Sequence, residues 1–203
     1  VDFTGWSYTG LTASQDSTNV SPYDFAGAYS AKLVTTGAWT FVNSTQIPVD
    51  PGTYFVVSAY VQSLNISSMN MYIDIYDASN NLLTTITDTH MMTNMWMRSN
   101  MHGLITIGSN ASYATVRFSG TGPGTFWLDM IQAEDSYNPT DYIDGNMPTA
   151  VGAIWSGTPN NSGTLYYPNK ATRILRLAQT LVDWIPMNAF WRVQTPAGME
   201  YTT

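Results

Sequence analysis

The sequence predicts an all-β protein, an antiparallel sandwich of the jelly-roll type followed by an irregular segment, one helix and a final strand. Three observations favour this class. Short segments of alternating apolar and polar residues recur about every 8 to 12 residues. Turns rich in Gly, Pro and Asn separate them, and no helix-period stretch lies between them. The 203 residues suffice for one sandwich, expected over residues 1–145, and an extension over 146–203.

The first elements are the least regular. Residues 1–28 are mostly Ser, Thr, Gly and Asp around single aromatics, which predicts one short strand and a loop. Two strands are expected at Tyr29–Thr35 and Trp39–Ile47, separated by Thr36-Gly37. Pro51-Gly52 then predicts a turn before the next strand.

The central strands show one-sided burial. In Thr53–Leu64, Phe55 and every second residue to Val61 share one face, and Tyr54, Ser58, Tyr60 and Gln62 share the other. Met69–Tyr76 repeats this pattern, and Leu82–Thr87 is its expected hairpin partner.

The later strands are less uniform. His90–His102 fits either a strand or a loop, and Ile105–Gly108 is a short element. Tyr113–Ser119 alternates again and leads into the closing strand, Thr125–Ile131. In that strand the alternation predicts Phe126, Leu128 and Met130 on one side, and Trp127, Asp129 and Ile131 on the other.

An irregular segment is expected after Glu134, because Asp, Asn, Pro, Gly and Thr replace the alternation. Such a segment has no strand-to-strand backbone hydrogen bonds to fix it. We expect Tyr137, Tyr142 and Trp155 to anchor it, each burying surface worth about one or two kcal/mol.

One helix is expected at about residues 170–185, capped by Asn169 and ended by Pro186. Its apolar stripe either packs on the sandwich or meets symmetry copies in a homotrimer. Phe190–Val193 is expected as the last strand, and Gly198–Thr203 as a frayed end or a cut. The candidate oligomerisation residues of the stripe, which also includes Ala171, are Ile174, Leu175, Ala178, Leu181, Val182 and Ile185.

Composition excludes several classes. The net charge is −7, and residues 1–145 hold three basic residues against twelve acidic ones, so the Lys/Arg stripe that binds nucleic acid is absent. Without cysteine there is no disulfide framework. No run of 18 apolar residues occurs, so membrane insertion is not expected. No signal peptide is visible, and the absence of an initiating Met suggests a processed product or a piece of a longer protein.

Motifs for catalysis are missing as well. His90 and His102 have neither Cys nearby nor a nucleophile-elbow Ser, and no H-E-x-x-H motif occurs. Glycoside hydrolysis needs two carboxylates flanking a bond, but Glu134 and Asp135 are adjacent on an extended chain and point to different sides. We therefore expect no enzyme. We interpret Glu134 and Asp135 as solvated acids of a loop.

An outward aromatic face is the main candidate site. If its rings lie on neighbouring strands, they form a flat platform on which pyranose faces stack, while charged side chains pair with hydroxyls. The alternative is that the rings stabilise the sheet by cross-strand pairing, or that a partner subunit covers them. The candidate carbohydrate-binding residues are Tyr54, Tyr60, Tyr72, Asp74, Trp96, Arg98, Tyr113 and Arg117, with Tyr76 beside them.

A family resemblance rests on the segment after the closing strand. Gln132-Ala133-Glu134, Pro139 to Gly145 and Trp155 to Asn160 resemble the end of carbohydrate-binding-module-like domains in minor tail proteins of bacteriophages that infect actinobacteria. Gly27 to Leu33 is similar to an early strand of such modules. The resemblance implies a virion protein of the phage tail, extracellular, that attaches to host cell-surface glycan beside other virion proteins.

The resemblance also implies a structural Ca2+ between an early loop and the closing strand. The matching position is Asp129, and Asp2, Asp16 or Asp24 is the expected early partner. Calcium takes six to eight oxygen ligands, backbone carbonyls included.

Three functions remain open at this point. The preferred one is a non-enzymatic tail protein that adheres to envelope glycan. The second is a purely structural tail-tip or capsid-decoration protein. The third is a polysaccharide-cleaving enzyme or its accessory module.

Overall fold

The structure is a computed structural model that describes residues 5–22, 28–37 and 40–142, and the short segments 153–155, 164–166, 192–194 and 200–202. Its contacts divide the chain into two units, Val1–Tyr142 and Ile143–Thr203. The boundary predicted from the sequence lies three residues later, after residue 145. Each unit is described by itself.

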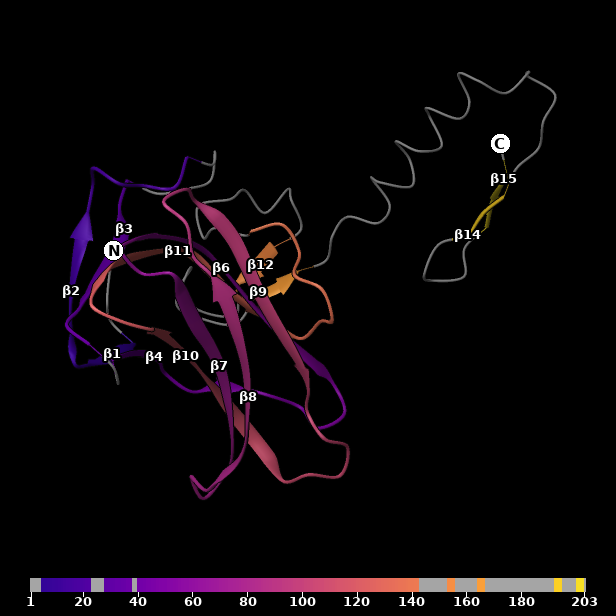
Figure 1. Cartoon of the computed structure of the whole chain (residues 1–203). Coiled ribbons are helices and arrows are strands. Elements are labelled where there is room, and N and C mark those ends of the chain that lie inside the picture. Colours follow the sequence, from indigo (N-terminus) through magenta and orange to yellow (C-terminus); the bar gives the residue numbers. More distant parts are fainter. Residues whose placement is uncertain are drawn as a thin grey trace. The chain divides into compact units, whose positions relative to one another are not determined.

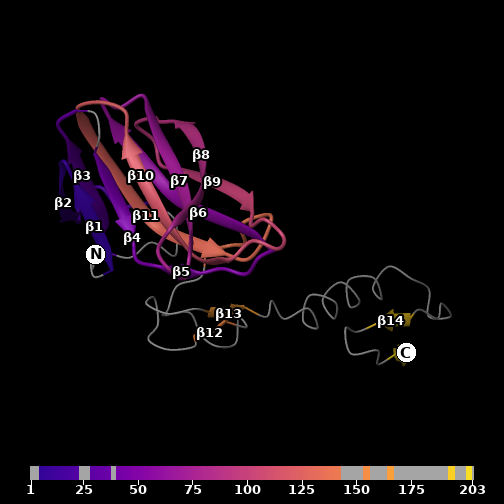
Figure 2. The same ribbon diagram turned by 90° about the horizontal axis from the view of Figure 1, so that it is seen from below.

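The first unit is a sandwich of two antiparallel sheets (Figures 1 and 2), which confirms the predicted fold class. One sheet has the order β1-β4-β10-β7-β8, with β5 also paired to β10. Its strands are β1 (Trp6–Thr9), β4 (Phe41–Ser44), β5 (Ile47–Pro48), β7 (Ser68–Asp77), β8 (Leu82–Met91) and β10 (Ala111–Gly120).

The other sheet has the order β2-β3-β11-β6-β9. Consecutive strands therefore often lie in different sheets, as the jelly-roll topology requires. Its strands are β2 (Leu11–Asp16), β3 (Ser30–Thr35), β6 (Tyr54–Leu64), β9 (Met97–Leu104) and β11 (Gly124–Glu134).

The core lies between the sheets and follows the predicted alternation. Phe55, Val57, Ala59 and Val61 of β6 face Met69, Met71, Ile73 and Ile75 of β7, and all eight are buried. Phe118 and Phe126 add fully buried rings from β10 and β11. Burying side chains of this size stabilises the fold by about 1.5 to 3 kcal/mol each.

Several strand predictions are corrected. Residues 1–28 contain two strands, β1 and β2, where one was expected, and Trp39–Ile47 is divided into β4 and β5. Ile105–Gly108 is not a strand. Ile105 is nevertheless buried, and its N–H and C=O bond the backbone of Thr53 and Gly52. The alternation cannot show such breaks, because they depend on pairing with distant segments: β1 pairs with β4, β2 with β3 and β5 with β10.

A β-bulge interrupts the closing strand. The register of β11 against β6 shifts between Asp129 and Gln132, and Met130 has a positive φ of 50°. Ile131 consequently packs against the core that holds Phe126 and Leu128. The predicted side for Ile131 is therefore wrong, because one extra residue in a bulge inverts the alternation beyond it.

The described segments of the second unit form two short hairpins. β12 (Ala153–Trp155) pairs with β13 (Thr164–Tyr166), and β14 (Arg192–Gln194) pairs with β15 (Glu200–Thr202). The last strand predicted at Phe190–Val193 overlaps β14, whereas the frayed end predicted at Gly198–Thr203 instead contains β15. The predicted helix at about 170–185 and its oligomerisation stripe lie outside the described residues.

Candidate functional site

The candidate residues lie on two different sheets, so the single platform expected from the sequence is wrong. Tyr72 and Asp74 are on β7, and Tyr113 and Arg117 are on β10. Tyr54 and Tyr60 are on β6 and Arg98 is on β9 of the other sheet, with Trp96 just before β9. The alternation shows which residues face outward but not which strands are neighbours. The outer faces are called the β10–β7 face and the β6–β9 face below.

On the β10–β7 face, Arg117 and Asp74 form an ion pair. The Nε and Nη2 of Arg117 donate to the two oxygens of Asp74 at 2.9 and 3.2 Å, and Thr85 Oγ1 donates to Asp74 at 2.6 Å. The guanidinium carbon lies 3.9 Å from the ring centre of Tyr72 and 4.8 Å from that of Phe41. Because each charge neutralises the other, these residues rigidify the face, and they are not the free charged hooks that the sequence predicted.

Beside this pair, two tyrosines stack across neighbouring strands. The rings of Tyr76 and Tyr113 are 5.0 Å apart at an interplanar angle of 11°. The hydroxyl of Tyr113 donates to Asn80 Oδ1 at 2.9 Å, which fixes the ring against the β7–β8 turn. Stacked cross-strand rings present a flat, amphipathic surface.

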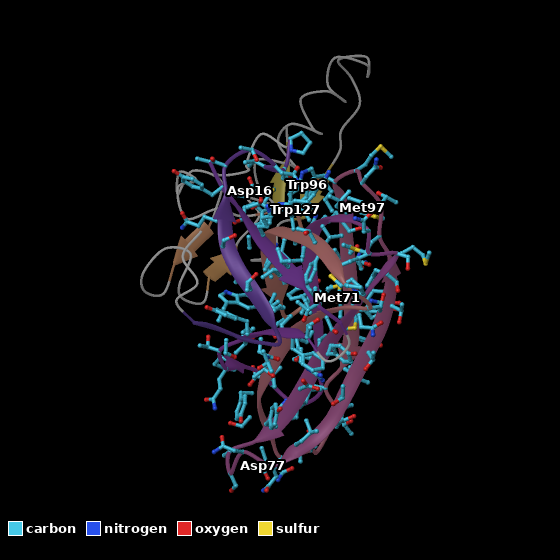
Figure 3. All side chains as sticks on the ribbon, turned by 60° about the vertical axis from the view of Figure 1, so that its left-hand side comes forward. Asp16, Met71, Asp77, Trp96, Met97 and Trp127 are labelled. Carbon is cyan, nitrogen blue, oxygen red and sulfur yellow. The ribbon has the colours of Figure 1, made fainter. Side chains whose placement is uncertain are left out.

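The β7–β8 turn is itself well ordered by Asp77, which Figure 3 shows at the end of the sandwich remote from Asp16 and Trp127. The Asp77 carboxylate accepts from the Ser79 and Asn81 N–H groups and from the Asn81 side chain, at 2.8 to 2.9 Å. The side-chain and backbone hydrogen bonds of Asn81 hold the pKa of Asp77 below its ordinary value. The turn thus carries a permanent negative charge at neutral pH.

The tyrosine pair borders an open groove of about 540 Å³, a volume in the range of small-ligand sites. Its lining is neutral throughout. Ser44, Thr45, Gln46 and Asn80 were not among the candidates predicted from the sequence, because only strand pairing and the β7–β8 turn bring them beside Tyr113. The lining residues are Ser44, Thr45, Gln46, Tyr76, Asn80, Tyr113 and Thr115.

The β6–β9 face differs, since the segment Asp135–Tyr142 crosses it. Arg98 Nη2 donates to Ser58 Oγ at 2.9 Å and to the Thr140 carbonyl at 2.6 Å. The Glu134 carboxylate accepts from the N–H and hydroxyl of Thr140. Ser58 points outward but is fully buried. Arg98 therefore clamps the crossing segment.

The expected anchoring by Tyr137 is found in the same segment. Its ring centre lies 4.9 Å from that of Tyr54 and 4.1 Å from that of His102. Tyr137 is still 51% exposed, so the hydrogen bonds of Glu134 and Arg98 supplement a partial aromatic contact. Tyr142 is half-buried, and Trp155 belongs to β12 of the second unit.

Asp129, the predicted calcium ligand, has a carboxyl group with one unpaired oxygen. Oδ1 accepts from Met130 N at 2.8 Å, while the buried Oδ2 has no hydrogen-bond partner. Burial raises the pKa of Asp129, and the backbone hydrogen bond from Met130 opposes this effect. An unpaired oxygen of this kind fits a cation.

The rest of a calcium site is not found in the described part of the chain. No group of three or more His, Cys, Asp or Glu side chains in these residues is arranged to hold a metal ion. Asp16 accepts hydrogen bonds from Thr18 and Trp127, and Asp2 and Asp24 lie outside the described residues. Calcium at Asp129, with backbone carbonyls and water as further ligands, therefore remains a proposal.

The Asp129→Asn variant tests both roles of this carboxyl group. Because the folded-state pKa is raised, ionising Asp129 costs stability once the pH exceeds its unfolded value of about 3.9. Without metal, the variant should be more stable than the wild type at pH 7, and equally stable below about pH 3. Melting temperatures at both pH values, with calcium and with EGTA, measure this. A wild-type melting temperature that calcium leaves unchanged would remove the metal proposal.

Within the described residues, no helix has the length and apolar character needed to cross a bilayer.

Comparison with known proteins identifies the fold but no family. No protein-family model and no curated protein sequence matches the chain. Among solved structures, an enzymatically active domain of a tailspike protein from bacteriophage CBA120 is 17% identical with a TM-score of 0.54, over 65% of this chain and 19% of that one. The chain thus spans about a fifth of the tailspike's length.

Two carbohydrate-binding modules of family 22 are similar over most of their own length. The xylan-binding domain from Paenibacillus barcinonensis is 14% identical with a TM-score of 0.50, over 66% of this chain and 88% of that one. The C-terminal module of a Clostridium thermocellum protein is 16% identical with a TM-score of 0.51, over 69% and 91%. The sandwich has the jelly-roll fold of these modules.

Proposed function

We propose that this chain is a non-enzymatic component of a phage tail whose sandwich adheres to host cell-envelope glycan through the β10–β7 face. The observation that carries the proposal is the open, neutral groove beside the stacked rings of Tyr76 and Tyr113. Pyranose rings stack on such tyrosines through their C–H faces, while hydroxyl and amide groups pair with the sugar hydroxyls. Gln46, Thr115 and Asn80 supply those groups.

The comparisons support the glycan part of the proposal. The two modules of family 22 share this fold, and one of them is described as a xylan-binding domain. The tailspike domain and the resemblance of the Gln132–Asn160 stretch support a phage-tail origin. Both are carried over to this chain as part of the proposal.

The carboxylates of Asp74 and Asp77, on the strand and turn beside the groove, are both engaged within the protein. Hydrolysis of a glycosidic bond requires an acid and a second carboxylate about 5 to 10 Å apart. Asp74 is bound to Arg117 and Thr85, and Asp77 holds the β7–β8 turn. Neither is free to act as an acid or a base. Incubation with purified host cell wall should therefore release no soluble sugar.

Retention of the purified chain on isolated host cell envelopes tests the adhesion. We expect the protein to sediment with the envelopes and to be released by soluble envelope polysaccharide. A protein that stays in solution at every envelope concentration would contradict the proposal. It would favour the structural alternative, in which a neighbouring tail protein covers the groove.

The expected homotrimer is tested by truncation. A helix of about 16 residues is marginal alone and must bury its apolar stripe. We propose that Ile174, Leu175, Ala178, Leu181, Val182 and Ile185 assemble three copies. Light scattering should then give a trimer for the full chain and a monomer without residues 146–203. A full chain that is monomeric at micromolar concentration would contradict this.

A further inference from the structure

The basic side chains of the sandwich are all engaged within the protein. Residues 1–142 contain three of them, Lys32, Arg98 and Arg117. Lys32 Nζ lies 3.9 Å from Asp16 Oδ2 and 5.9 Å from the ring centre of Trp127. Arg98 binds Ser58 and the Thr140 carbonyl, and Arg117 is paired with Asp74. Lys32 is 39% exposed but lies on β3 of the other sheet, so no unpaired lysine or arginine of this unit lies on the face of the groove.

Of the three basic residues, Arg117 is the one on the same face as the groove, so its pairing decides whether a bound anion could find a cation there. Both oxygens of Asp74 are taken by the Nε and Nη2 of Arg117, and the guanidinium carbon lies near the rings of Tyr72 and Phe41. An anionic ligand would have to break this bidentate pair and leave the carboxylate of Asp74, only 5% exposed, without its partner. Breaking a buried pair in this way is strongly unfavourable.

The groove itself offers only neutral groups to a ligand. Hydroxyls, amides and two tyrosine rings line it. Beside the groove, the β7–β8 turn carries one formal charge, the carboxylate of Asp77. Its lowered pKa keeps it ionised at neutral pH. The local charge is therefore zero or negative, within a chain of net charge −7.

We propose that the groove selects uncharged saccharides and rejects glycans that carry carboxylate, sulfate or phosphate groups. This inference rests on the proposed function and adds the ligand class. Binding proceeds through ring stacking and neutral hydrogen bonds, so it depends little on ionic strength, which screens interactions between exposed charges. An acidic group placed against this open groove gives up part of its hydration and gains no cation in return.

Matched derivatives of one polysaccharide test the ligand class. The full chain is run in native affinity gels that contain xylan, mannan, arabinogalactan or soluble host envelope polysaccharide. Each neutral polymer that retards the protein is then converted to a hydroxyethyl and a carboxymethyl derivative of equal substitution. We expect the hydroxyethyl form to bind within about twofold of the parent, and the carboxymethyl form to bind at least tenfold more weakly.

A charge variant provides the second arm. Thr115→Lys adds a cation inside the groove and should restore binding to the carboxymethyl derivative in a salt-dependent manner. Thr12→Lys makes the same change in net charge on β2 of the other sheet, and should restore nothing. Equal rescue by both variants would show a non-specific charge effect and overturn the assignment to this groove.

The failures of the two proposals are distinguishable. If anionic polymers alone retard the protein, or if affinity for the parent falls more than fivefold between 50 and 500 mM NaCl, the ligand class is wrong while glycan binding stands. If no saccharide of either kind binds, the proposed function fails and this inference fails with it.

Discussion

Replacing Phe118 with Ala is expected to lower the free energy of unfolding by about 3 to 5 kcal/mol, the usual effect of deleting a fully buried aromatic ring. Phe118 points inward from β10, has no exposed surface, and lies 6.3 Å from the ring of Trp6. The vacated space is bordered by strands of both sheets, so it cannot collapse without moving one of them. Urea denaturation followed by tryptophan fluorescence measures the loss.

Tyr29→Ala is the matched control for this prediction. Tyr29 is 47% exposed and precedes β3, so its removal should change the free energy of unfolding by less than about 0.5 kcal/mol. A Phe118→Ala variant as stable as this control would show that the inner face of β10 is not part of the core. It would also question the outward direction of Tyr113 and Arg117, which follow from the same alternation.

Loss of the stacked tyrosines should have the largest effect on binding. Tyr113→Ala removes a ring that both stacks on Tyr76 and borders the groove, and we expect affinity for envelope glycan to fall at least tenfold, or about 1.4 kcal/mol. The double variant Tyr76→Ala, Tyr113→Ala should bind below detection. Stability should change by no more than about 1 kcal/mol, because cross-strand pairs contribute little.

Two controls separate the ring from its hydroxyl and from the surface in general. Tyr113→Phe keeps the stacking surface and loses the bond to Asn80, so it should retain most of the affinity. Tyr29→Ala should bind like the wild type. Undiminished binding by the double variant, with the fold intact by circular dichroism, would refute a role for this face.

The sequence predicted the strands better than their neighbours. Alternation in Thr53–Leu64, Met69–Tyr76 and Tyr113–Ser119 identified β6, β7 and β10, because each has one apolar and one polar side. It did not reveal that β6 and β7 belong to opposite sheets, since strand order depends on pairing between distant segments. For this reason Tyr54 and Tyr72 were expected on one platform.

Chemical roles were harder to predict than exposure. Arg117 and Asp74 were correctly expected on one outward face, but their register places them within bonding distance of each other, so they pair instead of presenting two free charges. Asn80 lies at the groove because the β7–β8 turn brings it within hydrogen-bond distance of the Tyr113 hydroxyl, which the sequence does not show. The bulge at Met130 could not be predicted either, because Asp129–Gln132 contains no Gly or Pro that would mark an extra residue in the strand.

Saccharide is expected to bind the β10–β7 face and not the β6–β9 face. An NMR titration of the isotope-labelled chain with an oligosaccharide cut from a polymer that retards it in the affinity gels tests this most directly. Chemical-shift changes should concentrate at Gln46, Tyr76, Asn80, Tyr113 and Thr115. Shifts that instead concentrate at Tyr54, Tyr60, Trp96 and Arg98 would contradict it.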